Sequence, residues 1–187
     1  MYSDNEKQQI LALTKSAIQM AVQGRTEQQI LCQFSQEPFY LTEVRACFIS
    51  LHKGSQLRGC IGSLDAYRPL KEDIVHNAVS AALYDRRFPP LTEAEFDSIT
   101  VEVSILSPVM PMHVRDEADL LNQLQPYIDG LIIDDGKGHR ATFLPQVWKQ
   151  LPDKKEFLSH LKKKAGLENS EWPKSLQCLR YHCEVFQ

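Results

Sequence analysis

The segment from Ser98 to Leu106 alternates apolar and polar side chains more regularly than any other part of the chain. Such alternation is typical of a β-strand that buries one face and leaves the other more polar. We therefore expect a strand here, closed by Pro108 and Pro111 because proline cannot donate a ladder hydrogen bond. The apolar members of the pattern are Ile99, Val101, Val103 and Ile105.

Other segments show either helical or extended periodicity, and they do not follow a regular βαβ order. Apolar residues at helical spacing predict helices over residues 5–22, 69–85, 117–125, 145–150 and 154–165. Short apolar or alternating runs predict strands over 47–51, 57–61, 130–133, 140–143 and 176–186. This mixture predicts an α+β fold, a compact mixed or antiparallel sheet with flanking helices.

Composition narrows the class of protein. The chain has 187 residues, 43% hydrophobic and 24% charged, which suits one soluble domain over residues 1–187. The net charge of −3 provides no general attraction for phosphate backbones, so we do not expect nucleic acid as a partner. The N-terminus lacks a signal-peptide pattern, and no apolar run approaches the length of a membrane helix. We expect a cytoplasmic protein that does not bind membranes.

The cysteines and the known motifs exclude several kinds of site. The five cysteines form no C-x-x-C pair, and we expect reduced thiols. Cys178, His182 and Cys183 match no standard zinc spacing, so no metal is expected. No Walker A, G-x-G-x-x-G, H-E-x-x-H or G-x-S-x-G pattern occurs, and no cofactor is expected.

The segment Leu57–Gly62 is the strongest candidate for chemistry. On a regular strand Arg58 and Cys60 share a face, and a guanidinium beside a thiol favours the reactive thiolate. Gly59 and Gly62 allow another backbone or a ligand to approach closely. The alternative is a tightly packed strand in which Arg58 pairs with a structural carboxylate.

The segment after the helix over 69–85 offers further candidates. Arg86 and Arg87 can grip a carboxylate or phosphate, although cations at a helix C-terminus are also favourable without a ligand. Asn77 and Asp85 lie on a similar side of the helix, where they either face a cleft or complete a polar edge.

Two other titratable residues are candidates outside these segments. Glu102, on the polar face of the alternating strand, is a general base if it is buried and otherwise a solvated strand residue. His139, in a glycine-rich turn, is a ligand or acid–base group, or simply an exposed turn histidine.

Taken in order along nearly the whole chain, these segments resemble the AMMECR domain family, also called AmmeMemoRadiSam system protein A. The hexapeptide around Cys60 is the hallmark of the family. Many members have a cysteine near Leu161-Lys162-Lys163, so a two-cysteine mechanism is not expected here. The remaining matching segments are 48–51, 77–82, 85–91, 102–106, 141–148 and 164–167.

The resemblance implies a compact α+β domain, described in the family as two lobes around a cleft. It also implies a pathway shared with a Memo-like protein and a radical-SAM protein. Our first hypothesis is a cleft that binds or acts on a small anionic ligand. Cys60 would be the nucleophile, and Arg58 with Arg86 or Arg87 would supply charge. The alternative is a non-catalytic adaptor for those two partners, and nucleic-acid binding is a weaker third.

Overall fold

The computed structural model describes residues 1–34, 38–167 and 172–187. The chain divides into two compact units. Unit 1 comprises Met1–Leu106 with Glu184–Gln187, and unit 2 comprises Ser107–Cys183. Unit 2 is thus an insertion between two strands of the sheet in unit 1.

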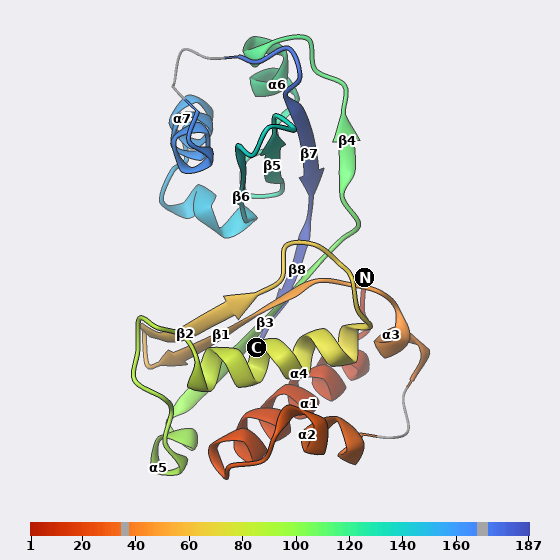
Figure 1. The fold of residues 1–187 in the computed structure, drawn as a ribbon, viewed down its shortest axis with the longest axis vertical. Helices are drawn as coiled ribbons and strands as arrows, with labels where there is room; N and C mark the ends of the chain where they lie inside the picture. Colours follow the sequence, from red (N-terminus) through yellow and green to blue (C-terminus); the bar gives the residue numbers. More distant parts are fainter. Residues whose placement is uncertain (35–37, 168–171) are drawn as a thin grey trace. The chain divides into compact units, whose positions relative to one another are not determined.

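Unit 1 is built on a sheet with the strand order β2-β1-β3-β8. Helices α1, α2 and α4 lie on one side of this sheet (Figure 1). The strands are β1 (Cys47–Lys53), β2 (Gln56–Gly62), β3 (Ile99–Leu106) and β8 (Cys183–Phe186). The helices are α1 (Asp4–Val22), α2 (Glu27–Gln33), α3 (Phe39–Thr42), α4 (Leu70–Leu83) and α5 (Glu93–Phe96).

The alternation of the central strands decides which side chains form the core of unit 1. Ile49 and Leu51 on β1 and Val101 and Val103 on β3 are buried in the cluster that includes α1 and α4. The side chains between them, Ser50 among them, belong to the opposite face of the sheet. The predicted strand over 98–106 and its buried face are confirmed.

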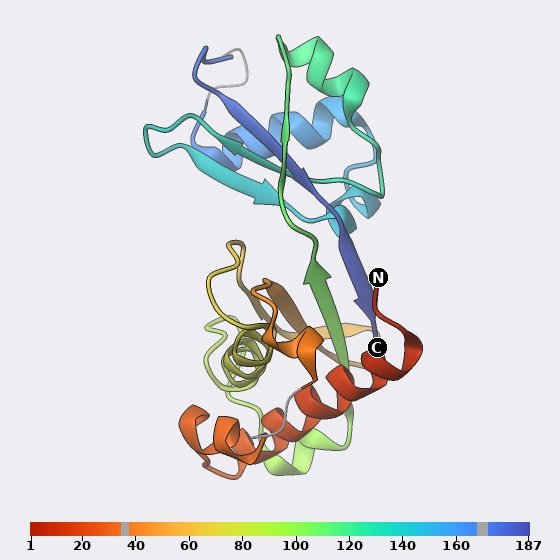
Figure 2. The same ribbon diagram turned by 90° about the vertical axis from the view of Figure 1, so that its right-hand side faces the viewer.

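The two ends of the chain are joined within unit 1 (Figure 2). The backbone N–H of Tyr2 donates to Glu184 at 3.1 Å, and Lys7 pairs with the same carboxylate at 3.0 Å. Ser3 then caps α1 in a capping box with Glu6, because its hydroxyl accepts from the Glu6 N–H. Glu184 on β8 therefore contacts both the residue before the N-cap of α1 and the first part of the helix itself.

Unit 2 is a second α+β layer with its own core. Helix α7 packs on the sheet through β6 and β5, and Trp148 stacks on Phe157 with ring centroids 3.7 Å apart. Its strands, in the order β4-β7-β5-β6, are β4 (Met110–Met112), β7 (Gln177–Tyr181), β5 (Gly130–Asp134) and β6 (Arg140–Phe143). Its helices are α6 (Glu117–Gln123), the 3₁₀ helix η1 (Pro145–Lys149) and α7 (Lys154–Ala165).

Two strand predictions need correction. The segment 176–186 is not one strand, because β7 and β8 belong to different sheets. Between them, the carbonyl oxygen of His182 accepts from the Ser107 N–H, and the His182 N–H donates to the Ser107 hydroxyl. A further strand, β4, contains Pro111, which was expected only to close the preceding strand. It lies at the edge of its sheet, where a missing N–H costs no ladder bond.

Some helix predictions were also incomplete. The short helix α2 was missed, although Thr26 and Gln29 form a capping box that the sequence contains. Pro69 is the N-cap of α4 rather than its first helical residue. No helix in the described parts of the chain is both long and apolar enough to span a membrane.

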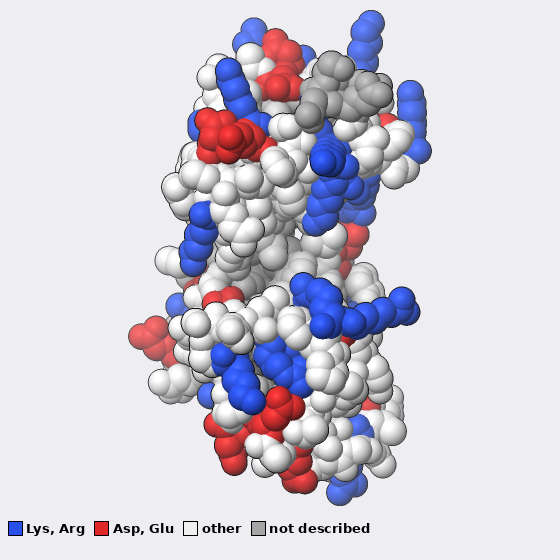
Figure 3. Space-filling view, turned by 90° about the vertical axis from the view of Figure 1, so that its left-hand side faces the viewer, with Lys and Arg blue, Asp and Glu red and all other residues white. Residues whose placement is uncertain are grey.

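The surface carries mixed charge. On the face shown in Figure 3, Lys and Arg side chains are interspersed with Asp and Glu within each unit. This pattern agrees with the nearly balanced composition.

Candidate functional site

Strand β2 is an edge strand, and a bulge in it redirects Arg58. Leu51 pairs with Gly59 but His52 pairs with Leu57, so Arg58 is an extra residue in the ladder. The regular alternation that was expected to place Arg58 and Cys60 on one face is therefore broken.

The guanidinium of Arg58 bonds to other groups than Cys60. It donates to both carboxylate oxygens of Glu95, at 3.3 and 3.1 Å, and to the carbonyl oxygen of Pro90 at 3.4 Å. Arg58 is buried, and its bonds lower the pKa of Glu95 to about 2. These contacts match the alternative in which Arg58 pairs with a structural carboxylate.

Arg87 is the arginine that reaches Cys60. Its Nε and Nη2 atoms donate to Oδ1 and Oδ2 of Asp85, at 2.9 and 2.7 Å, which is a bidentate pair. The same Nη2 atom donates to the carbonyl oxygen of Cys60 at 2.9 Å. In return, the N–H of Cys60 donates to Oδ2 of Asp85 at 2.8 Å. Asp85 and Arg87 therefore bond the outward-pointing N–H and C=O of Cys60 on this edge strand. Without them, these backbone groups would be open to pairing with another strand.

The bonds of Arg87 to Asp85 and to Cys60 also bring a positive charge to the residue that carries the thiol. The pKa of the Arg87 guanidinium is raised, chiefly by its hydrogen bond to Asp85 and less by charge and hydrogen-bond interaction with Cys60. The pKa of buried Asp85 is lowered, chiefly by its hydrogen bond from Arg87. Asp85 thus orients the guanidinium, while 57% of the Arg87 side chain remains exposed.

The Cys60 thiol lies in a row of polar side chains that crosses the sheet. Cys60 is opposite Ser50 on β1, and Ser50 is opposite Glu102 on β3. The Ser50 hydroxyl donates to Sγ of Cys60 at 3.3 Å. All three residues are partly exposed, so the row is accessible from the face of the sheet away from the α4 core.

At both glycines of the hexapeptide, other atoms of the protein pack where a side chain would otherwise lie. A Cβ on Gly59 would lie 2.3 Å from the backbone oxygen of Ala81, because α4 crosses β2 closely there. A Cβ on Gly62 would lie 2.2 Å from the ring of Phe48. The close approach expected at these positions is made by another backbone and by a ring.

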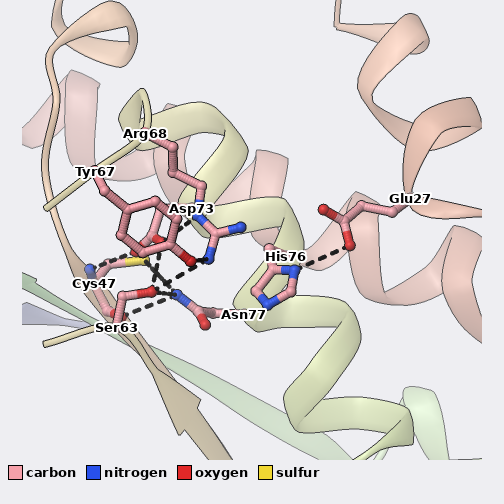
Figure 4. A network of polar contacts seen from close by, with 8 residues as sticks. All are labelled: Glu27, Cys47, Ser63, Tyr67, Arg68, Asp73, His76 and Asn77. Atoms are coloured by element: carbon pink, nitrogen blue, oxygen red, sulfur yellow. Dashed lines mark hydrogen bonds and ion pairs between the residues drawn. The ribbon is translucent and has the colours of Figure 1, made fainter. Parts of the chain in front are cut away.

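Asn77 belongs to a separate polar network at the start of α4 (Figure 4). Its Nδ2 lies 2.9 Å from Oδ2 of Asp73 and 3.2 Å from the Cys47 carbonyl oxygen. Buried Asp73 also accepts from the Cys47 N–H at 2.8 Å, from the Ser63 hydroxyl and from Arg68. Asn77 thus links β1, the residue after β2 and α4, and its hydrogen bonds within the described part of the chain go to Asp73, Ser63 and Cys47.

The last two predicted site residues differ in their surroundings. Arg86 is exposed, and no hydrogen bond or ion pair involves it among the described residues. His139 lies in unit 2, where its Nδ1 is 2.7 Å from Oδ2 of Asp135. This bond lowers the pKa of Asp135 to about 2. His139 therefore belongs to a different unit from the other candidates.

Sequence reasoning missed one contributor to the site, Ser50, and placed the wrong arginine beside Cys60. Ser50 was not considered because the pairing of β1 with β2 fixes its position, and pairing register is not visible in either strand alone. The roles of Arg58 and Arg87 were exchanged because a bulge is not visible in the local pattern. The hairpin turn between residues 52 and 56 was the available signal that these strands pair.

Comparisons with known proteins agree on one family. A sequence model of the AMMECR1 family matches residues 11–186. Protein MJ0810 of Methanocaldococcus jannaschii is 40% identical over 158 residues, which cover 80% of this chain and 76% of that protein. A protein of Methanothermobacter thermautotrophicus is 36% identical over 80% of this chain and 78% of its own. The crystal structure of the uncharacterized protein PH0010 from Pyrococcus horikoshii superposes with a TM-score of 0.80 at 27% identity. It covers 94% of this chain and 88% of that chain.

Proposed function

This chain belongs to the AMMECR1 family, and we propose that it binds a small anionic ligand beside Cys60 and acts on it through the Cys60 thiolate. The observation that carries the proposal is the position of Arg87, which buried Asp85 holds in a hydrogen bond to the backbone carbonyl oxygen of Cys60. A fixed guanidinium next to a thiol favours the thiolate, which is the nucleophilic form.

The charge for an anionic ligand comes from the segment 85–87. Asp85 compensates the charge of Arg87, but a guanidinium has five N–H donors, and the exposed part of Arg87 can still donate to a carboxylate or phosphate. Arg86 is exposed and follows Asp85 directly. We assign Arg86 the long-range attraction of the anion and Arg87 the contact with it. Arg58, engaged with Glu95, is assigned a structural role.

The nucleophile is tested by the pH dependence of Cys60 alkylation with iodoacetamide, followed by peptide mass spectrometry. Arg87→Ala should raise the midpoint pH of Cys60 alkylation, because the thiolate loses its adjacent cation. Arg58→Ala is the matched control, an arginine of the same region bound to a carboxylate, and should leave that midpoint unchanged. Equal effects of the two variants would contradict the proposal.

The anion preference is tested with a charged and a neutral reagent. The thiolate displaces iodide from iodoacetate and from iodoacetamide in the same way, but only iodoacetate is negatively charged. The ratio of the two alkylation rates therefore reports the local electrostatic potential. We expect this ratio to be several-fold higher at Cys60 than at exposed Cys32, and to fall in Arg86→Ala and in high salt. The same ratio at both cysteines would contradict an anion site.

A second candidate function is docking of a Memo-like or radical-SAM partner, which the family resemblance implies. It is favoured by exposed apolar side chains around the start of α4, where Val44 and Pro69 form an isolated bridge. These side chains are Phe39, Val44, Leu64 and Tyr67, with Phe39 81% exposed. A purified partner whose binding is lost in Tyr67→Ala or Phe39→Ala but kept in Cys60→Ser would support docking.

A further inference from the structure

The antiparallel ladder places Ser50 unusually well to contact Cys60. The backbone N–H and C=O of Cys60 point outward to Asp85 and Arg87, so Ser50 and Cys60 form a pair without mutual backbone hydrogen bonds. In such pairs the Cα atoms are only about 4.5 Å apart and the side chains are close. This explains why a side chain as short as serine reaches the sulfur, with Oγ and Sγ 3.3 Å apart.

The distance allows the Ser50 hydroxyl to donate to the sulfur. A sulfur anion has no hydrogen to donate and needs such a donor. Arg87 approaches Cys60 from the outer edge of β2, whereas Ser50 lies on the neighbouring inner strand β1. Cys60 is thus bonded through its carbonyl to a cation at the outer edge, and through its sulfur to a neutral hydroxyl on the inner strand.

We infer that Ser50 is a positioning residue that orients and stabilises the Cys60 thiolate, and that Glu102 opposes this effect from the next strand. This inference rests on the proposed thiolate function and adds the residues that set its strength. Hydrogen bonds to charged groups are stronger than those between neutral groups. Loss of the Ser50 hydroxyl therefore destabilises the thiolate form of Cys60 more than the thiol form.

The opposing effect of Glu102 follows from its register. Ser50 and Glu102 are directly opposite, and side chains so placed lie on one face of the sheet about 5 Å apart at Cβ. A carboxylate there repels a thiolate and competes for the single hydroxyl hydrogen of Ser50. Both effects disfavour the thiolate. The other titratable or charged groups near the row are Arg87, Asp85 and His52.

The test measures the midpoint pH of Cys60 alkylation by iodoacetamide in four variants. Ser50→Ala should raise the midpoint by about half a unit to one unit, through loss of a charge-assisted hydrogen bond. Ser50→Thr, which keeps a hydroxyl on a strand-compatible side chain, should have the same midpoint as the unchanged protein. Glu102→Gln should lower it. Glu72→Gln, which removes one charge from an exposed position on α4, should leave it unchanged.

The possible results separate this inference from the proposed function. A midpoint that does not change in Ser50→Ala, or that rises equally in Ser50→Ala and Ser50→Thr, overturns the role of the hydroxyl. A midpoint that rises in Glu102→Gln overturns the opposing role of Glu102. Failure of the proposed function has another signature, since Arg87→Ala would then leave the midpoint unchanged whatever the Ser50 variants do.

Discussion

The guanidinium of Arg87 and the carbonyl of Cys60 meet at 2.9 Å across the open edge of β2. This bond, with the bond from the Cys60 N–H to Asp85, replaces a neighbouring strand with two side chains. The same two side chains cover the sheet edge and bring a cation to the residue that carries the thiol. Architecture and candidate chemistry therefore use the same residues, so variants must be judged by stability as well as reactivity.

Gly59→Ala should destabilise the protein strongly. The new methyl group would lie 2.3 Å from the backbone oxygen of Ala81, which cannot move without shifting α4. Overpacking of this kind costs about 1–3 kcal/mol. Urea unfolding at pH 7 measures the loss, and Gln56→Ala, at an exposed position of the same strand, is the control. A Gly59→Ala protein as stable as the control would contradict the close packing of α4 on β2.

Asp73→Asn should cost about 3 kcal/mol of unfolding free energy, because it leaves Arg68 without its buried carboxylate partner. The amide also presents N–H donors to groups that now donate to Asp73, including the Cys47 N–H. Cys60 alkylation should be unaffected in folded Asp73→Asn protein, since the bonds of Asp73 in the described part of the chain go to Cys47, Ser63, Arg68 and Asn77. Urea unfolding and the alkylation midpoint are measured on the same preparation. A changed midpoint would show that the two polar clusters are coupled.

Acid should weaken the contribution of the Arg58–Glu95 pair. The pKa of Glu95 is lowered from 4.5 to about 2, chiefly by its hydrogen bond from Arg58. A carboxyl group whose pKa is lower in the folded state stabilises that state fully above its unfolded pKa. That contribution is lost progressively as the pH falls from about 4.5 towards 2.

Urea unfolding of the unchanged protein and of Glu95→Gln at a series of pH values checks this sign. The stability advantage of the unchanged protein should be constant above pH 5.5 and shrink below pH 4.5. Glu72→Gln shows how much of the trend comes from removing any carboxylate. An advantage that grows in acid would be the wrong sign for this ion pair.

The cysteines should differ widely in alkylation rate. Burial raises the pKa of Cys178 and of Cys183 to about 12, and it raises the pKa of fully buried Cys47 as well. At pH 8 these thiols are almost entirely protonated and should react far more slowly than exposed Cys32. Mass spectrometry of each peptide gives the order, and urea should bring all the rates together. Fast labelling of Cys178 in the folded protein would contradict its buried position.

The sequence alone predicted the fold class and most elements because hydrophobic periodicity is a local property. The alternation over 98–106 and the helical spacing over 5–22 and 154–165 each match a described element closely. The segment 176–186 failed because its alternation continues while its partner changes from one sheet to the other at His182. Which strand a segment pairs with depends on the rest of the fold, and the alternation of apolar and polar residues does not reveal it.

The candidate site divides in the same way. The sequence by itself determined which segments are candidates for chemistry, the arginine-rich segment and the hexapeptide around Cys60, since residue type and spacing are visible there. Only the tertiary structure decided that Arg87 rather than Arg58 contacts Cys60, and that Ser50 and Glu102 complete the row. The physical reason is register. A bulged residue accompanies the turn of Arg58 to Glu95. The pairing of β1 with β2 sets Ser50 against the thiol, and the pairing of β1 with the distant strand β3 sets Glu102 beside Ser50.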